Sequence, residues 1–338
     1  MTAALVVVVL GLAAMGGIGL GWGTAALLHG WLAAAIAVHG LAFGGLLLLL
    51  VDHVIPQHWS LRVERAAEAA ALTMPLVGLA FVPVLAGMAA VWPWASVAAW
   101  PEDWPNHAWL APGFFAGRTV AFFLAWSVLA VLAATRTRKV ARPAVAAVGL
   151  IVWALSGSLA GFDWQMSLEP PFRSTIFGLL FLEDQTLTAV AFAVLVSAGR
   201  QGTRPGPLAA VLLSVVLLWS YLAFMQYLII WSADLPHEIG FFLRRLDGGW
   251  LWLARGLAAT LGGAAFLVLL PGYVRHSVPR LRAVAAFVLA LRLAETAWLV
   301  LPAWPGPALP GVLAFCAGLA ALGGLWLLLF RRLVHARP

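Results

Sequence analysis

The stretch WLAAAIAVHGLAFGGLLLLLV, residues 31–51, decides the fold class of this chain. His39 is the only ionisable side chain in it. A bilayer core about 30 Å thick is crossed by a helix of roughly 20 predominantly apolar residues, so the stretch predicts one transmembrane helix. Its apolar residues are continuous, which excludes a membrane β-strand of about 10 alternating residues.

Similar runs fill the rest of the 338-residue sequence, of which 63% is hydrophobic and only 10% charged. A typical soluble domain has about 25% charged residues. The sequence therefore predicts an all-α integral membrane protein that forms a single polytopic domain over residues 1–338. The longest connection, residues 52–70, is predicted to be a surface helix. Ten spans are expected, at about residues 3–22, 31–51, 71–97, 113–135, 143–163, 174–198, 206–231, 250–272, 280–301 and 310–330.

Basic residues divide unevenly between the two sides of these ten spans. Of the 20 Lys and Arg residues, 14 lie after even-numbered spans, and three lie after odd-numbered spans. Because basic connections stay in the cytoplasm, both termini are predicted to be cytoplasmic. Topology and attraction to anionic lipid then account for the net charge of +7, and nucleic acid is not expected as a partner.

The spans contain a weak internal repeat. His39 and Glu183 lie at similar depths in spans two and six, and Arg118 and Arg255 do so in spans four and eight. One candidate organisation is therefore two tandem four-helix bundles, at about 31–163 and 174–301, plus two extra helices.

Ionisable groups within the spans are costly, at about 2.5 to 3.5 kcal/mol each, and such groups often mark ion or proton pathways. Arg292 and Glu295 are three residues apart on one helix and can pair. Each group also has an alternative to a role in a pathway. Arg292 and Glu295 can form a buried ion pair that only fixes helix orientation, and His39 can be a hydrogen-bonded core histidine. The proton-path candidates are His39, Asp52, His53, Glu183, Asp184, Arg292 and Glu295.

No metal site is expected in this chain. Cys316 is the only cysteine, which excludes CxxC and CxxCH motifs. His39 and His53 are predicted to lie on one helix, and the other histidines lie at span ends or in loops, so bis-histidine haem ligation is not expected either. Redox cofactors would have to be held by other chains.

The longer motifs of the chain are GFDWQMSLEPPFRSTIFG (161–178), WSYLAFMQYLIIWSADLPHEIGFFLRR (219–245), HGLAFGGLLLLLVDHVIPQHWSLRVERAAEAAALTMP (39–75), PGFFAGR (112–118) and RLAETAWLVLP (292–302). These motifs resemble those of a known family, the NrfD-like membrane subunits, and within it the ActF-type quinone-binding-type subunit 2 of alternative complex III. The resemblance implies a quinol:cytochrome c oxidoreductase complex in the bacterial inner membrane, in which this chain is a scaffold, proton path or quinone-binding subunit. It also implies haem c and iron–sulfur clusters on partner chains. Those partners are a sister NrfD-like subunit, periplasmic iron–sulfur and cytochrome c subunits, and a terminal cytochrome oxidase as a further candidate.

The two longest motifs also carry candidate binding residues. Hydroxyl, amide and indole groups among apolar walls suit a quinone headgroup, which accepts hydrogen bonds at two carbonyls. Both motifs also have a purely structural interpretation. The polar groups of span seven can form interhelical hydrogen bonds, and the residues around Pro170–Pro171 can form a rigid corner between two spans. Quinone candidates are Asp163, Trp219, Tyr221, Gln226 and Tyr227. Charged residues of the outer connections are candidates for docking a partner, namely Glu169, Arg173, Asp234, Glu238, Arg244 and Arg245.

Two other functions stay open from the sequence. An ion-coupled transporter would use the buried acids and Arg292 as coupling sites, and Pro75 and Pro83 could break a helix as carriers require. A membrane assembly or accessory subunit of a terminal oxidase fits the same composition.

Overall fold

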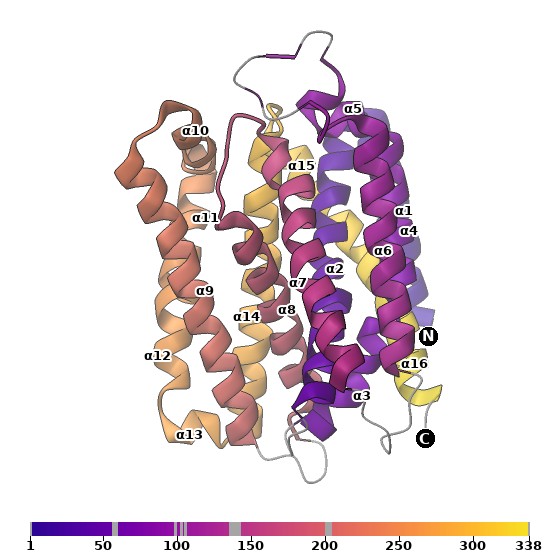
Figure 1. Ribbon diagram of the computed structural model, residues 1–338, viewed down its shortest axis with the longest axis vertical. Coiled ribbons are helices and arrows are strands. Elements are labelled where there is room, and N and C mark those ends of the chain that lie inside the picture. The colour runs from indigo at the N-terminus through magenta and orange to yellow at the C-terminus, as the bar shows by residue number, and fades with distance from the viewer. Residues whose placement is uncertain are drawn as a thin grey trace.

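The computed structural model describes residues 2–55, 60–97, 100–101, 104, 107–134, 143–199 and 205–336 (Figure 1). All regular structure in these ranges is helical. The helices are α1 (Thr2–Trp22), α2 (Thr24–Val54), α3 (Ser60–Ala71), α4 (Met74–Ala86), α5 (Met88–Val91), η1 (Pro93–Ala95), α6 (Pro112–Ala134), α7 (Pro143–Trp164), η2 (Met166–Leu168), α8 (Phe177–Ser197), α9 (Pro205–Ala233), α10 (Pro236–Arg245), α11 (Gly248–Ala259), η3 (Thr260–Ala264), α12 (Ala265–Leu269), α13 (Gly272–Arg275), α14 (Val278–Val300), η4 (Leu301–Ala303), α15 (Ala308–Gly318), η5 (Leu319–Gly323) and α16 (Gly324–Ala336).

Ten helical segments in the described ranges are long and apolar enough to cross a membrane. The chain is thus an all-α multi-pass membrane protein, and the prediction of ten spans is confirmed. The third span differs most from its predicted bounds, because it runs from Val63 to Ala86 rather than over 71–97. The division into two four-helix bundles stays a prediction.

The helix expected in the 52–70 connection is present as α3, but it packs against the core instead of lying on the surface. Helix α3 packs against α2 through small side chains that are buried, among them Ala66, Ala67 and Ala70. A Cβ atom at Gly45 of α2 would lie 2.9 Å from the Cβ atom of Ala70. The alanines of α3 therefore form a close helix contact, and the exposed Arg65 lies on its other face.

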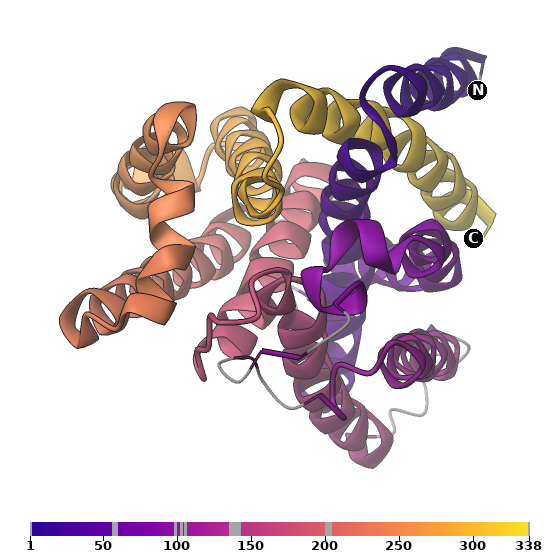
Figure 2. The ribbon, with the colours of Figure 1, turned by 90° about the horizontal axis from the view of Figure 1, so that it is seen from above.

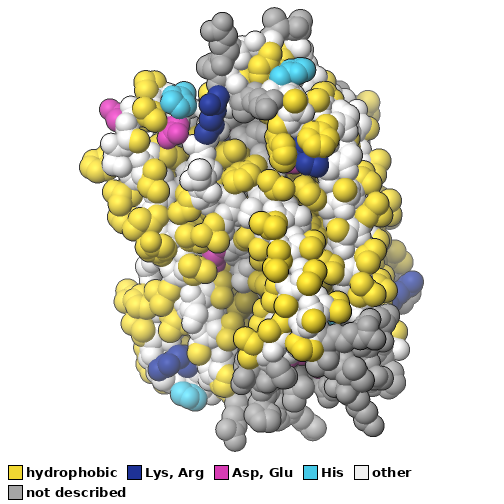
Figure 3. All heavy atoms as spheres, in the orientation of Figure 1, with side chains coloured by type: hydrophobic (Ala, Val, Ile, Leu, Met, Phe, Trp, Pro, Cys, Tyr) yellow, Lys and Arg dark blue, Asp and Glu magenta, His cyan; other side chains and the backbone are white. Residues whose placement is uncertain are grey.

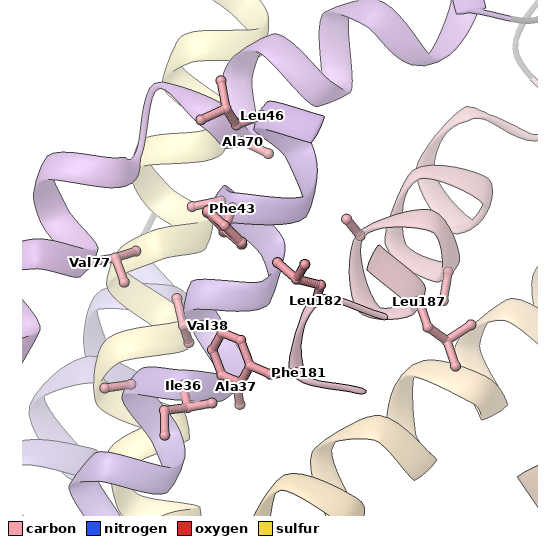
Figure 4. Packing of buried hydrophobic residues seen from close by; sticks show 14 of the residues in the cluster. Ile36, Ala37, Val38, Phe43, Leu46, Ala70, Val77, Phe181, Leu182 and Leu187 are labelled. Atoms are coloured by element: carbon pink, nitrogen blue, oxygen red, sulfur yellow. The ribbon is translucent and has the colours of Figure 1, made fainter. Parts of the chain in front are cut away.

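Helix α2 is the hub of the fold, and most of its length is buried. Its glycines allow close approach to several neighbours: a Cβ at Gly30 would lie 2.6 Å from the backbone nitrogen of Phe315 in α15, and one at Gly44 would lie 2.4 Å from the carbonyl oxygen of Gln185 in α8. Figure 4 shows Phe43 of α2 in the core beside residues of α3, α4 and α8. Small residues at such crossings are the usual means of packing helices in a membrane.

Helices α9 to α13 form a layer on one side of the molecule (Figure 2). Within this layer the eighth span is interrupted by η3, which is a π-helix with the sequence TLGGA. A π-helical turn widens the backbone and often accompanies a functional site. This layer packs against α8 and α14, and the candidate site lies between them.

Charged side chains gather at the two ends of the molecule, while its visible side is mostly hydrophobic with one acidic spot at mid-height (Figure 3). Both termini lie toward the end that carries α3, α13 and α16, and α5 and α10 lie at the other end (Figure 1). The positive-inside rule predicts that the end with the termini faces the cytoplasm. The α10 end is called the outer end below.

Candidate functional site

Helix α8 carries three consecutive polar residues, Glu183, Asp184 and Gln185, all buried. Because successive helical residues differ by about 100° in direction, these side chains face three different neighbours. The Gln185 Oε1 atom lies 2.9 Å from Nδ1 of His39 on α2. The Asp184 Oδ1 atom lies 2.9 Å from Nη2 of Arg292 on α14. Helix α8 therefore links two polar clusters across the interior.

The cluster that contains Asp184 and Arg292 continues onto α9. The guanidinium of Arg292 also pairs with Glu295 on its own helix. The other carboxylate oxygen of Glu295, Oε1, accepts a hydrogen bond of 3.0 Å from the indole nitrogen of Trp219. Asp184, Arg292, Glu295 and Trp219 thus form one connected chain across α8, α14 and α9, which we call the polar belt. Arg292 serves two acids, so each carboxylate has a cationic partner.

Glu183 stands apart from this belt. It is 3% exposed, and neither of its carboxylate oxygens has a hydrogen-bond partner among the described residues. An ionised carboxylate without a partner is very costly in an apolar interior. In the described spans, pairing with another side chain therefore does not explain the presence of Glu183.

His39 lies in an aromatic cage rather than in the polar belt. Its ring centroid is 4.8 Å from that of Phe43 and 5.2 Å from those of Trp126 and Trp164. The ring is fully buried, and Nε2 has no partner among the described residues. Aromatic side chains of α2, α6, α7 and α8 thus surround the imidazole of His39.

A cavity of about 640 Å³ lies between α8, α9, α10, α11, η3 and α14. This volume is typical of small-molecule sites, which are mostly apolar with a few polar groups. Aromatic side chains form much of its wall, and its polar side chains are Ser220, Gln226, Arg255 and Glu295. The aromatic lining residues are Phe177, Trp219, Phe224, Tyr227, Phe241, Phe242 and Trp298.

The cavity has a buried back and an open front. Gln226 and Glu295 at the back are 3% and 4% exposed. Phe224 and Tyr227 on α9 are 57% and 44% exposed, and Arg255 on α11 is also exposed. Since these front residues lie within spans, the cavity opens toward the lipid.

Gln226 supplies an unused polar group at this cavity. Its Oε1 atom accepts a 2.7 Å hydrogen bond from the hydroxyl of Ser174. Its Nε2 atom is buried and has no partner among the described residues. A buried amide without a partner costs about 1 to 3 kcal/mol, so a ligand with an acceptor oxygen would relieve this cost.

Two of the five predicted quinone residues lie away from the cavity. Tyr221 does not line it and is 57% exposed on α9. Asp163 is fully buried and forms a bidentate ion pair with Arg118, with distances of 2.9 Å from Nε to Oδ2 and 2.8 Å from Nη2 to Oδ1. Trp109 adds an indole hydrogen bond of 3.0 Å. The carboxylate of Asp163 is therefore a structural acceptor between α6 and α7.

Two of the six predicted docking residues are buried within the chain. Arg245 is 0% exposed and pairs with Glu169, and its Nη2 atom donates to the carbonyl of Leu299 at 2.6 Å. Its guanidinium also stacks on Phe241, 3.5 Å from the ring centroid. Burial lowers the pKa of the Arg245 guanidinium, and the Glu169 carboxylate opposes this shift. These contacts fasten α10 over the outer end of the cavity, so the two side chains cannot dock a partner.

The remaining docking candidates lie at the outer surface. Arg173, Asp234 and Arg244 are exposed, and Glu238 is half-buried. Arg244 lies 3.8 Å from Glu169 and keeps 59% of its side chain exposed.

Asp52 and His53 lie far from the polar belt. Asp52 follows His39 by 13 positions in α2, which places it about 20 Å farther along the helix axis. The structure therefore does not bring these two candidates together with Glu183, Asp184, Arg292 and Glu295.

Sequence reasoning missed Gln185, Ser174 and Arg255 as members of these sites. Gln185 directly follows two acids in a span. This position indicates an interhelical contact, because amide side chains in spans form hydrogen bonds with neighbouring helices. Among the described residues, no group of three His, Cys, Asp or Glu side chains could hold a metal ion.

No protein-family model matches the chain, and no curated protein sequence matches it significantly.

Proposed function

We propose that this chain is an integral membrane subunit of a quinol-oxidising respiratory complex and that its cavity binds the quinone ring. The buried Nε2 atom of Gln226 carries the proposal, because Gln226 lines the cavity and this donor lacks a partner in the described structure. A quinone carbonyl is a suitable acceptor. The aromatic walls suit a flat apolar ring, and the opening toward lipid suits a ligand that is dissolved in the bilayer.

The side chains at the back of the cavity would hold and deprotonate the headgroup. When bound, a quinol supplies two electrons and two protons, and both protons would leave one after the other through the same carboxylate. Glu295 is the acidic side chain at the cavity wall, and a carboxylate is a suitable general base. Arg292 and Trp219 fix its two oxygens in place. Asp184 lies on the far side of Arg292, so a proton received at Glu295 would enter the polar belt. The electrons would leave to haem and iron–sulfur groups on partner chains.

The outer end would receive those partners. Exposed charges at Arg173, Asp234 and Arg244 can pair with periplasmic iron–sulfur and cytochrome c subunits. A sister NrfD-like subunit and a terminal cytochrome oxidase complete the proposed assembly in the bacterial inner membrane.

An ion-coupled carrier is the second candidate function. The π-helix η3 interrupts the eighth span beside the cavity, and the polar belt borders the same cavity at Glu295. Interrupted helices next to buried charges are typical of carrier sites.

Calorimetric titration of the purified protein with decylubiquinone tests the quinone proposal. Gln226→Leu should weaken binding about fivefold to tenfold, because it removes a hydrogen bond without adding charge. Gly263→Leu should abolish binding, because Gly263 lines the cavity and a Cβ there meets no atom within 4 Å, so a larger side chain would fill the ligand space.

Gly256→Leu is the matched control, because Gly256 lies in the same span, is equally free of contacts, and does not line the cavity. It should bind as the unchanged chain does. Equal binding in all four proteins would refute the quinone site. Ion-driven uptake by vesicles containing the purified chain alone would instead favour the carrier.

A further inference from the structure

Arg255 differs from the other two arginines within the apolar runs. Arg118 pairs with Asp163, and Arg292 pairs with Asp184 and Glu295. Arg255 is exposed on α11 and forms no ion pair or hydrogen bond with the described residues. Its one charge-related contact is with the ring of Trp252, whose centroid lies 5.0 Å from Cζ. An uncompensated arginine within a span is costly, so its charge calls for an anion from outside the chain.

The direction of the side chain indicates where that anion lies. Arg255 follows Gly248, the first residue of α11, by seven positions, or about 10 Å along the helix. Trp252 lies three residues nearer the outer end, so the guanidinium is turned toward that end. Arginines turn in this way to reach the headgroup layer, and tryptophan is enriched at the same level.

We propose that Arg255 binds the phosphate of an outer-leaflet phospholipid at the lipid-facing front of the cavity. A guanidinium binds phosphate through two parallel hydrogen bonds. The acyl chains would lie along the apolar front between α9 and α11, where Phe224 and Ala258 are exposed and line the cavity. This inference is independent of the quinone proposal, because it concerns the front of the cavity and not Gln226 at its back.

Photo-crosslinking with defined lipids tests the proposal. The photoreactive residue p-benzoylphenylalanine replaces Ala258, one turn below Arg255. The delipidated protein is then mixed with phosphatidylglycerol or with diacylglycerol of the same chains, and the crosslinked lipid is quantified by mass spectrometry. Phosphatidylglycerol should crosslink about tenfold more than diacylglycerol, because a contact between two charged groups contributes at least that factor.

Arg255→Gln should reduce phosphatidylglycerol crosslinking to the diacylglycerol level, and Arg255→Lys should keep part of it because the charge remains. Arg280→Gln is the matched control: Arg280 is also exposed beside an aromatic ring, 5.1 Å from that of Tyr273, but lies at the opposite end of the molecule. It should leave crosslinking at Ala258 unchanged.

Equal labelling with the two lipids, or equal labelling in Arg255→Gln and the unchanged chain, would overturn the proposal. Loss of phosphatidylglycerol labelling on addition of millimolar inorganic phosphate would assign the site to a free anion and would also overturn it.

Discussion

Replacing Arg118 with Met should be among the most damaging single changes in the first half of the chain. Its guanidinium donates two hydrogen bonds to Asp163 and a third, of 2.9 Å, from Nη1 to the carbonyl oxygen of Trp109. Asp163 is fully buried and, among the described residues, would keep only the Trp109 indole as a side-chain donor. Breaking a buried pair from one side costs about 3 to 5 kcal/mol, and we expect the free energy of unfolding to fall by that amount.

The measurement is unfolding in mixed micelles by titration with sodium dodecyl sulfate, followed by far-ultraviolet circular dichroism. The double variant Arg118→Met/Asp163→Leu should recover most of the loss, because neither charge is then left alone in the interior. Arg255→Met is the comparison, since Arg255 has no ion-pair or hydrogen-bond partner among the described residues and its removal should cost less than about 1 kcal/mol. If Arg118→Met is no more destabilised than Arg255→Met, the pair does not hold α6 to α7 as argued.

The remaining predictions concern packing and the buried acids. Gly30→Ala should destabilise the protein by about 1 to 3 kcal/mol in the same titration, because its Cβ would lie 2.4 Å from a Cβ atom of α15. Gly16→Ala is the control, because among the described residues its Cβ would meet no atom of another helix within 4 Å, and equal stability of the two variants would contradict the close α2–α15 contact. Glu183→Gln should not lower the unfolding free energy, because Glu183 has no hydrogen-bond partner among the described residues to lose and an unpaired buried carboxylate is itself costly, yet it should lower proton movement coupled to quinol oxidation in the reconstituted complex. Asp184→Asn should cost about 1 to 3 kcal/mol because a charge-assisted contact is lost; the reverse order of the two acid variants would place the structural role at Glu183.

The sequence predicts the spans well because each one is a local property of about 20 residues. The pairing of Arg292 with Glu295 is predictable for the same reason, since both residues lie on one helical face. Helical geometry also separates the quinone candidates of span seven into those that face the interior and those that face outward. Trp219 and Gln226 are seven residues apart and share a face, whereas Tyr221 is about 200° away from Trp219 and faces outward.

The contacts that the sequence does not predict join segments that are distant in the chain. In the sequence, Asp163 is a candidate for binding a ligand. In the structure, α6 places Arg118 beside it, and the two side chains form an ion pair. Arg245 lies between two spans and is expected at the surface, but α10 folds back over the bundle and buries it against Glu169 and Leu299. In both cases burial depends on helix packing, which hydropathy along the chain does not encode.

The central position of α2 has a consequence for biosynthesis. This helix leaves the ribosome well before several of the helices that it contacts: His39 bonds to Gln185, 146 residues farther along, and Gly30 packs against α15. Until those helices are inserted, the glycine surfaces of α2 that the later helices contact, and the imidazole of His39, must be covered by lipid or by a chaperone. A stop codon before α15 should therefore leave the earlier helices incompletely assembled and exposed to membrane proteases.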